Sequence, residues 1–218
     1  MRRNLLIILV FLSAWIPVLQ GQAAYTFGIK GGISLANQRF RITPIDYTIE
    51  TEPLPGPVVS LFLEPFGGVH FSFQLDLSYG CKGSLTKVQG VTVNHLEQDR
   101  ITLLEGKMTR SRFRYLSISP GVRYRMGQGP LVPYVLAGPR LDLLLKYSTD
   151  SDYPLEEQRV VVFGLSCGAG VEYSLQKVGL FGELQYQPDF TAVTSEEPLL
   201  IRNHMLSLSF GIRWMNPE

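Results

Sequence analysis

Residues 69–79, with the sequence Val-His-Phe-Ser-Phe-Gln-Leu-Asp-Leu-Ser-Tyr, alternate apolar and polar side chains without a break. A period of two is that of a β-strand with two different faces, because successive side chains point to opposite sides of a strand. One face must meet apolar surroundings and the other polar ones. This is the situation of a strand that has lipid on its outside and a polar barrel interior on its inside.

The same alternation recurs along most of the chain. It covers seven further stretches, at residues 25–37, 58–66, 112–125, 132–147, 160–174, 178–187 and 204–214. Glycine is frequent on their polar faces, where a narrow barrel needs small side chains. No helical periodicity competes with these stretches, so we expect an all-β chain with eight strands.

The connections between these stretches alternate between long and short. The short ones cover residues 67–68, 126–131 and 175–177, and the long ones cover 38–57, 80–111, 148–159 and 188–203. Outer-membrane barrels have short periplasmic turns and longer extracellular loops. The pattern therefore predicts an eight-stranded antiparallel up-and-down transmembrane β-barrel of the bacterial outer membrane, with both termini periplasmic.

The N-terminus has the order of a signal peptide. Arg2 and Arg3 precede an apolar run over residues 5–19, and small or polar residues follow at 21–24. A membrane anchor helix is the alternative, but the run is short of the roughly 20 residues that a spanning helix needs, and Pro17 interrupts its end. We expect residues 1–23 to be a signal peptide and residues 24–218 to form the barrel domain.

Composition excludes one class of partner. The 20 Lys and Arg residues nearly balance the 19 Asp and Glu residues, and no basic stripe marks a nucleic-acid binder. Cys81 lies at the end of the third predicted strand and Cys167 lies inside the sixth. These strands are not expected to be neighbours, so we expect no disulfide between the two cysteines.

The polar faces carry many charges of both signs. They are Lys30, Glu64, Asp76, Arg123, Arg140, Asp142, Glu172, Glu183 and Arg213. An eight-stranded barrel has room inside for little more than side chains or one small ligand, so such charges must pair. We expect a structural, salt-bridged plug, with an ion path or ligand-binding lumen as the alternative. A soluble lipocalin-like carrier is a further alternative, but its interior would be apolar. The charged residues listed above are too many for such an interior.

Several local features lead to further expectations. Seven aromatic residues near strand ends suit the girdles of a membrane barrel, although strand propensity alone also favours them: Tyr25, Tyr79, Tyr124, Tyr147, Tyr173, Tyr186 and Trp214. Pro120 and Pro139 lie inside predicted strands, and we expect local bulges there because proline lacks the ladder donor. Arg112 and Arg114 have outward parity near the outer end of their strand, where anionic headgroups would meet them.

The sequence does not favour an enzyme. His204 and Ser207 are the close histidine–serine pair on a strand, but residues three apart on a strand point to opposite faces. Asp150 and Asp152 lie near the carboxylates at 156–157 in an outer connection, which leaves weak calcium binding as an alternative to a solvated surface. We expect no catalytic residue, metal site or cofactor.

A set of short motifs resembles one known family. The motifs cover residues 27–32, 115–120, 122–124, 133–139, 168–173 and 206–214. In order and spacing they resemble the PorT-like outer-membrane β-barrel (porin family) proteins of Bacteroidetes-type bacteria. The resemblance implies an eight-stranded outer-membrane barrel without implying a shared activity. Phe210 and Trp214, close to the C-terminus, are the aromatic residues that the barrel-assembly machinery would read as a terminal signal.

These observations lead to a functional expectation. The chain is expected to be a monomeric outer-membrane barrel with a structural or surface-interaction role and no open pore. Its expected partners are outer-membrane lipid, the barrel-assembly machinery and an unidentified extracellular or periplasmic protein. The long connections outside the cell, especially the one at residues 80–111, would present a surface to partners or ligands. The alternative, which the resemblance implies, is an accessory role in protein secretion or assembly at the outer membrane.

Overall fold

The computed structural model describes residues 26–42, 51–93, 101–150, 158–194 and 199–215. Within these ranges, side chains are described except at residues 41–42, 87–93, 101–107 and 199. The expected signal peptide, residues 1–23, lies outside the described residues. None of the described residues belongs to a helix that is long and apolar enough to cross a membrane.

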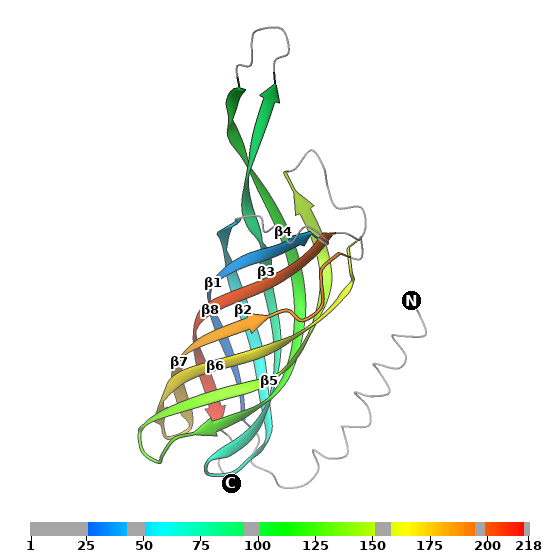
Figure 1. The fold of residues 1–218 in the computed structure, drawn as a ribbon. Helices are drawn as coiled ribbons and strands as arrows, with labels where there is room; N and C mark the ends of the chain where they lie inside the picture. Colours follow the sequence, from blue (N-terminus) through cyan, green and yellow to red (C-terminus); the bar gives the residue numbers. More distant parts are fainter. Residues whose placement is uncertain (1–25, 43–50, 94–100, 151–157, 195–198, 216–218) are drawn as a thin grey trace, which may run out of the picture.

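The described residues form a closed barrel of eight antiparallel strands, each paired with its neighbours in sequence (Figure 1). The strands are β1 (Thr26–Ile42), β2 (Thr51–Gly67), β3 (Phe71–Val93), β4 (Ile101–Arg125), β5 (Leu131–Thr149), β6 (Val161–Leu175), β7 (Val178–Pro188) and β8 (Leu199–Met215). The first and last strands close the ring, from Thr26 opposite Met215 to Ile42 opposite Leu199. The predicted all-β, up-and-down barrel is confirmed.

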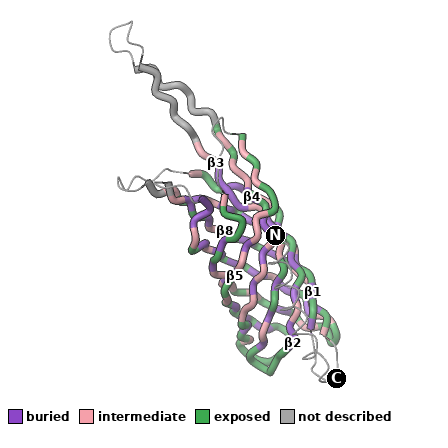
Figure 2. Tube along the Cα trace, turned by 90° about the vertical axis from the view of Figure 1, so that its right-hand side faces the viewer, coloured by how far each residue is buried: buried purple, intermediate pink, exposed green. Residues whose placement is uncertain are grey.

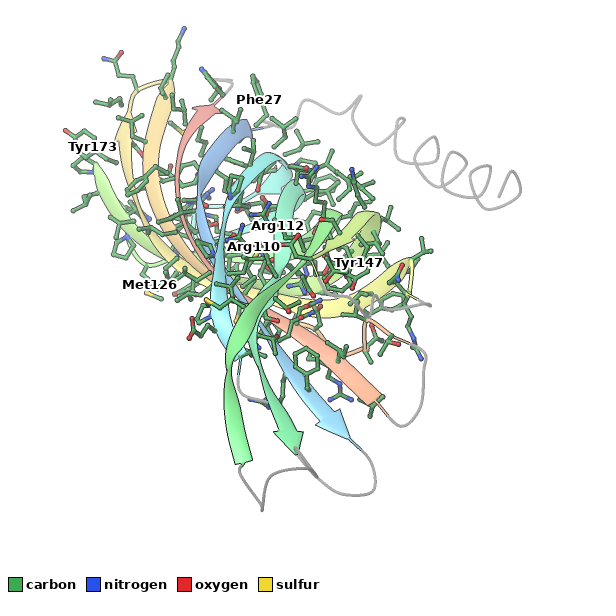
Figure 3. All side chains as sticks on the ribbon, turned by 90° about the horizontal axis from the view of Figure 1, so that it is seen from above. Phe27, Arg110, Arg112, Met126, Tyr147 and Tyr173 are labelled. Carbon is green, nitrogen blue, oxygen red and sulfur yellow. The ribbon has the colours of Figure 1, made fainter. Side chains whose placement is uncertain are left out.

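The alternation of the sequence becomes the inside and the outside of the wall. Along β1, Phe27 and Ile29 are exposed on the outer surface, whereas Lys30 and Ser34 are buried inside. The same alternation of buried and exposed positions continues around the barrel (Figure 2). Phe27 and Tyr173 lie on the outer side of the wall (Figure 3). The apolar rows therefore form a continuous outer band, as a lipid-facing surface requires.

The strands are longer than predicted at the end of the barrel with the long connections, which we call the wide-loop end. Most of the expected connection at residues 80–111 is strand, because β3 continues to Val93 and β4 begins at Ile101. These two strands pair with each other as a ribbon that stands beyond the rest of the barrel (Figure 1). The ribbon has left the wall whose lipid-facing and interior sides impose alternation, so alternation does not mark it in the sequence.

The expected bulges at Pro120 and Pro139 are wrong. β4 pairs continuously with β3 through Pro120, and its ladder with β5 resumes beyond Pro120 in an unchanged register. Close approach of the strands accommodates the prolines instead. A Cβ atom on Gly138 would lie 2.0 Å from the carbonyl oxygen of Pro120, so only glycine fits there.

A bulge does occur further along the same pair of strands. The register of β4 and β5 shifts between Arg114 and Tyr115. An extra residue on β5 reverses the sides to which the following side chains point. Tyr147, expected in an outer aromatic girdle, instead packs inside, with its ring 4.6 Å from that of Phe113. Tyr25 lies outside the described residues.

The other five expected girdle residues lie on the outer surface. They are Tyr79, Tyr124, Tyr173, Tyr186 and Trp214.

Candidate functional site: the charged interior of the barrel

All nine charged residues expected on the inner face are buried in the barrel interior, each 5% exposed or less. Ion pairs assemble them, together with three further charged residues, into three layers across the barrel. We call these the lower, middle and upper layers, counted from the end with the short turns. A layer of apolar side chains follows the upper layer.

The lower layer consists of two carboxylates between three arginines. Glu64 on β2 accepts from Arg123 (3.0 Å), Arg125 (2.7 Å) and Arg213 (2.7 Å). Glu172 on β6 accepts from Arg123 at 2.6 Å and from Arg213 at 2.8 Å. The two glutamates and the arginines of β4 and β8 thus form a ring of charge-assisted hydrogen bonds that closes the barrel across its axis.

The middle layer places one lysine between two carboxylates. Lys30 Nζ on β1 lies 2.9 Å from Asp76 Oδ1 on β3 and 2.7 Å from Glu183 Oε1 on β7. Tyr134 donates its hydroxyl to the other oxygen of Glu183 at 2.9 Å. The ring of Tyr134 also lies 3.5 Å from the guanidinium carbon of Arg123. Tyr134 therefore joins the middle layer to the lower one through a hydrogen bond and a cation–π contact.

The upper layer is centred on Asp142 and Asp189. Lys82 Nζ lies 2.8 Å from Asp189 Oδ1 and also pairs with Asp142. Arg140 Nε lies 2.9 Å from Asp142 Oδ1, and the Arg140 guanidinium also pairs with Asp189. Asn203 donates to Asp189 at 3.1 Å. Asp142 and Asp189 therefore each pair with both Lys82 and Arg140. The side chains of the two aspartates are fully buried.

An apolar cluster covers the upper layer at the wide-loop end. Phe113, Tyr115, Val162 and Val193 are buried together, and Leu144 and Tyr147 pack against them. Val193 comes from the segment after β7, which turns inward and donates its backbone N–H to the carbonyl of Ile201 on β8. Side chains fill the interior between these layers so closely that a cavity between β3, β4, β5 and β6 measures about 10 Å³, which holds one water molecule at most.

The charges of the three layers balance. Among the described residues, the interior ion pairs join six cations to six carboxylates. The lower layer has three cations and two carboxylates, and the middle layer has one cation and two carboxylates. Because these two layers are adjacent, the excess charge of one offsets that of the other. Buried charges persist in proteins when they are paired in this way, although the pairs add little net stability over apolar packing.

Three charged members of the network were not predicted: Lys82, Arg125 and Asp189. Lys82 and Asp189 belong to segments expected to be outer connections, and strand alternation does not extend to them in the sequence. Arg125 could have been predicted from the sequence. It lies two residues after Arg123 at the end of β4, and residues two apart on a strand point to the same side, here the interior.

The geometry offers little for chemistry or metals. Ser207 is buried inside the barrel, whereas His204 is half-buried on the opposite parity of β8. Within the ranges that the structure describes, no three histidine, cysteine or carboxylate residues lie together as a metal site would require. Asp152 and residues 156–157 of the alternative calcium site lie outside these ranges, and Asp150 is exposed.

Comparison with known proteins identifies the family. The outer membrane protein beta-barrel domain family matches residues 20–194, which is most of the chain. The chain belongs to this family. Membership places the protein in the bacterial outer membrane, as expected from the sequence. No curated protein matches the chain.

Solved structures of small outer-membrane barrels resemble this one. The outer membrane protein OprG from Pseudomonas aeruginosa is 10% identical, with a TM-score of 0.52 over 91% of this chain and 99% of that one. Neisserial surface protein A is 16% identical, with a TM-score of 0.48 over 86% and 96% of the two chains. The outer membrane protease OmpT from Escherichia coli is 8% identical, with a TM-score of 0.49 over 88% and 97%. The similarity to OprG supports the fold, and none of these identities assigns an activity.

Proposed function

We propose that this protein is a sealed monomeric barrel with a structural or surface-interaction role, and that it is neither a pore nor an enzyme. The observation that supports this proposal is the filled interior. Three layers of paired charges and an apolar cluster lie in series between the two ends. An ion that crossed the barrel would have to break buried pairs in each layer, at several kcal/mol per uncompensated charge.

The proposed orientation places both termini in the periplasm. Thr26 and Met215 pair at the end where the short turns lie, so the described part of the chain starts and finishes there. The wide-loop end, with the ribbon of β3 and β4, then faces the outside. This orientation follows the loop asymmetry of outer-membrane barrels.

The ribbon is the proposed surface for a protein partner. β2 pairs with β3 only as far as Thr86, and β5 pairs with β4 only from Ser111. Beyond these residues β3 and β4 pair with each other as far as Val93 and Ile101. Both outer edges of the ribbon therefore present backbone N–H and C=O groups that a further strand can pair with.

A deletion of the ribbon tests this role. Lys87 and Met108 are cross-strand partners, so residues 88–107 can be replaced by a two-residue Asn-Gly turn that keeps the barrel register. We expect the variant to fold and to lose the proteins that crosslink to the wild type on whole cells. A matched control is Gln128→Ala, in a short turn at the opposite end. Crosslinked products that are the same in the deletion variant as in the wild type would refute the proposal.

Conductance tests the sealed barrel separately. Wild-type protein in a planar bilayer is expected to show no stepwise currents. Steady single-channel currents from the folded monomer would overturn the sealed-barrel proposal and favour the ion path instead.

An accessory role in protein secretion or assembly is the second candidate. The motifs that resemble PorT-like proteins support it, and the ribbon would then bind a component of the export apparatus. Phe210 and Trp214 are exposed on the outer face of β8 near the short-turn end, where the proposed assembly signal would be accessible. Loss of secreted proteins from the medium of a deletion strain, restored by the wild type but not by the ribbon deletion, would favour this candidate.

A further inference from the structure

Two arginines face each other on the outer surface of the barrel seam. Arg39 on β1 is the direct cross-strand partner of Arg202 on β8, and both side chains are exposed. Like charges in directly opposite positions of an antiparallel pair repel each other. An anion that lies between or beside the two guanidinium groups would relieve this repulsion.

Three more cations lie on the outer surface where β4 pairs with β5, and the exposed Arg110 follows them just beyond this pairing. Arg112 and Arg114 are on β4, and Lys146 on β5 is the cross-strand partner of Arg114. Their side chains point outward, because the intervening Phe113 is buried inside. We call Arg39, Arg202, Arg112, Arg114 and Lys146 together the basic collar.

Hydrogen bonds inside the wall show that the two parts of the basic collar lie at one height. Gln38, which precedes Arg39, donates to Asn203, which follows Arg202. Gln38 also accepts from Ser84 on β3, and Ser84 is the partner of Ser111 on β4, next to Arg112. The two parts of the basic collar therefore lie at the level of the upper layer, one on the β1–β8 side of the barrel and one on the β4–β5 side.

The basic collar lies just beyond the apolar band. On β8 the outward residues Trp214, Ile212, Phe210, Leu208 and Leu206 are all apolar and exposed. This row covers about 20 Å of the barrel axis at ~3.3 Å per residue and a tilt of ~40°, close to the apolar band of an outer-membrane barrel.

Arg202 follows four residues further along β8, and Arg112 lies four residues beyond Leu116, where the outward row of β4 ends. That is the depth of the headgroups. Among the described residues, no carboxylate forms an ion pair with any member of the basic collar.

From this placement we infer that the basic collar binds the phosphate groups of a phosphorylated glycolipid in the outer leaflet. The inference rests on the proposed orientation, in which the wide-loop end faces outward. Arginine suits this ligand because its planar guanidinium binds phosphate oxygens through two hydrogen bonds. The acyl chains of such a lipid would lie against the apolar rows directly below the collar, so both ends of the ligand have a matching surface.

Native mass spectrometry of the full-length mature protein tests the inference. The protein in mild detergent is mixed with equal amounts of diphosphorylated lipid A, dephosphorylated lipid A and phosphatidylglycerol. We expect diphosphorylated lipid A to be retained in preference to the other two. The variant R39Q/R202Q is expected to bind it about thirtyfold more weakly, since each cation near a lipid surface contributes roughly a factor of five.

Two controls separate charge from structure. Lys177→Gln removes an exposed cation at the short-turn end and is expected to bind as the wild type does. R39K/R202K keeps both charges but loses the planar guanidinium, so it should bind more tightly than R39Q/R202Q and more weakly than the wild type. Equal retention of the dephosphorylated lipid by the wild type would overturn the inference, and equal retention of phosphatidylglycerol would overturn the assignment to a glycolipid. Cleavage of the ribbon by protease added to whole cells tests the orientation independently.

Discussion

The lower layer gives the sharpest test of a dry, paired interior. Glu172 is 4% exposed and accepts from two guanidinium groups, at 2.6 Å from Arg123 and at 2.8 and 3.0 Å from Arg213. Glu172→Gln keeps the shape of the side chain and removes its charge. Glu64 would then be the one carboxylate among Arg123, Arg125 and Arg213 within the described layer.

The expected cost follows from how deeply the pairs are buried. Removing one partner of a buried ion pair destabilises a protein by about 3–5 kcal/mol, because an uncompensated charge stays behind. In a water-filled lumen the same change would cost about 1 kcal/mol or less, since water screens charges at this distance. A dry interior and a water-filled lumen therefore predict losses in the free energy of unfolding that differ several-fold.

Urea titration of the protein folded into phosphatidylcholine vesicles measures this cost, with gel mobility of unheated samples as the readout. Asp150→Asn is the matched control, because Asp150 is an exposed carboxylate and its loss should change the free energy of unfolding by less than about 0.5 kcal/mol. A value for Glu172→Gln within about 1 kcal/mol of the wild type would show that water reaches the layer, and the sealed barrel would have to be abandoned.

Three further changes test other parts of the structure. Gly138→Ala should lower the free energy of unfolding by more than about 2 kcal/mol, because the added Cβ would lie 2.0 Å from the Pro120 carbonyl oxygen. In the same titration Gly67→Ala should be close to neutral, because the nearest atom to its added Cβ is 3.5 Å away. Tyr134→Phe removes the hydroxyl that donates to Glu183 and should lower the free energy of unfolding by about 1.5–3 kcal/mol. Tyr124→Phe, on the outer surface, should lower it by less than about 0.5 kcal/mol. Equal losses for the two variants would contradict the buried hydrogen bond. Nitroxide labels at Leu75 or Leu208, introduced through single cysteines with Cys81 and Cys167 replaced, should report lipid by electron paramagnetic resonance; contact with water at both would mean that the wall faces the other way.

The sequence predicts the wall of the barrel well because the membrane imposes two different environments on each strand. Residues 69–79 show this most plainly, since Leu75 must be compatible with lipid and Asp76 with the interior. Wherever both environments are present, the period of two gives the strand and the side to which each residue points. The nine charged residues expected inside are found there for this reason.

Prediction fails where the two environments end. The ribbon of β3 and β4 stands beyond the wall, where no difference between lipid and barrel interior imposes an alternating pattern on its strands. Asp189 and Val193 reach the interior through a segment that bends inward after β7, and that bend depends on contacts with β6 and β8. Tyr147 turns inward because of a register shift between β4 and β5 that no local sequence signal announces.

The wiring of the middle layer bears on how the protein enters the membrane. Lys30 comes from β1, and its two carboxylates come from β3 and β7, so no hairpin of consecutive strands carries Lys30 together with either of its counter-ions. A hairpin that inserted alone into the hydrocarbon region would carry an unpaired charge with it. The sheet must therefore curl into a cylinder, and neutralise itself, before or while it leaves the aqueous compartment.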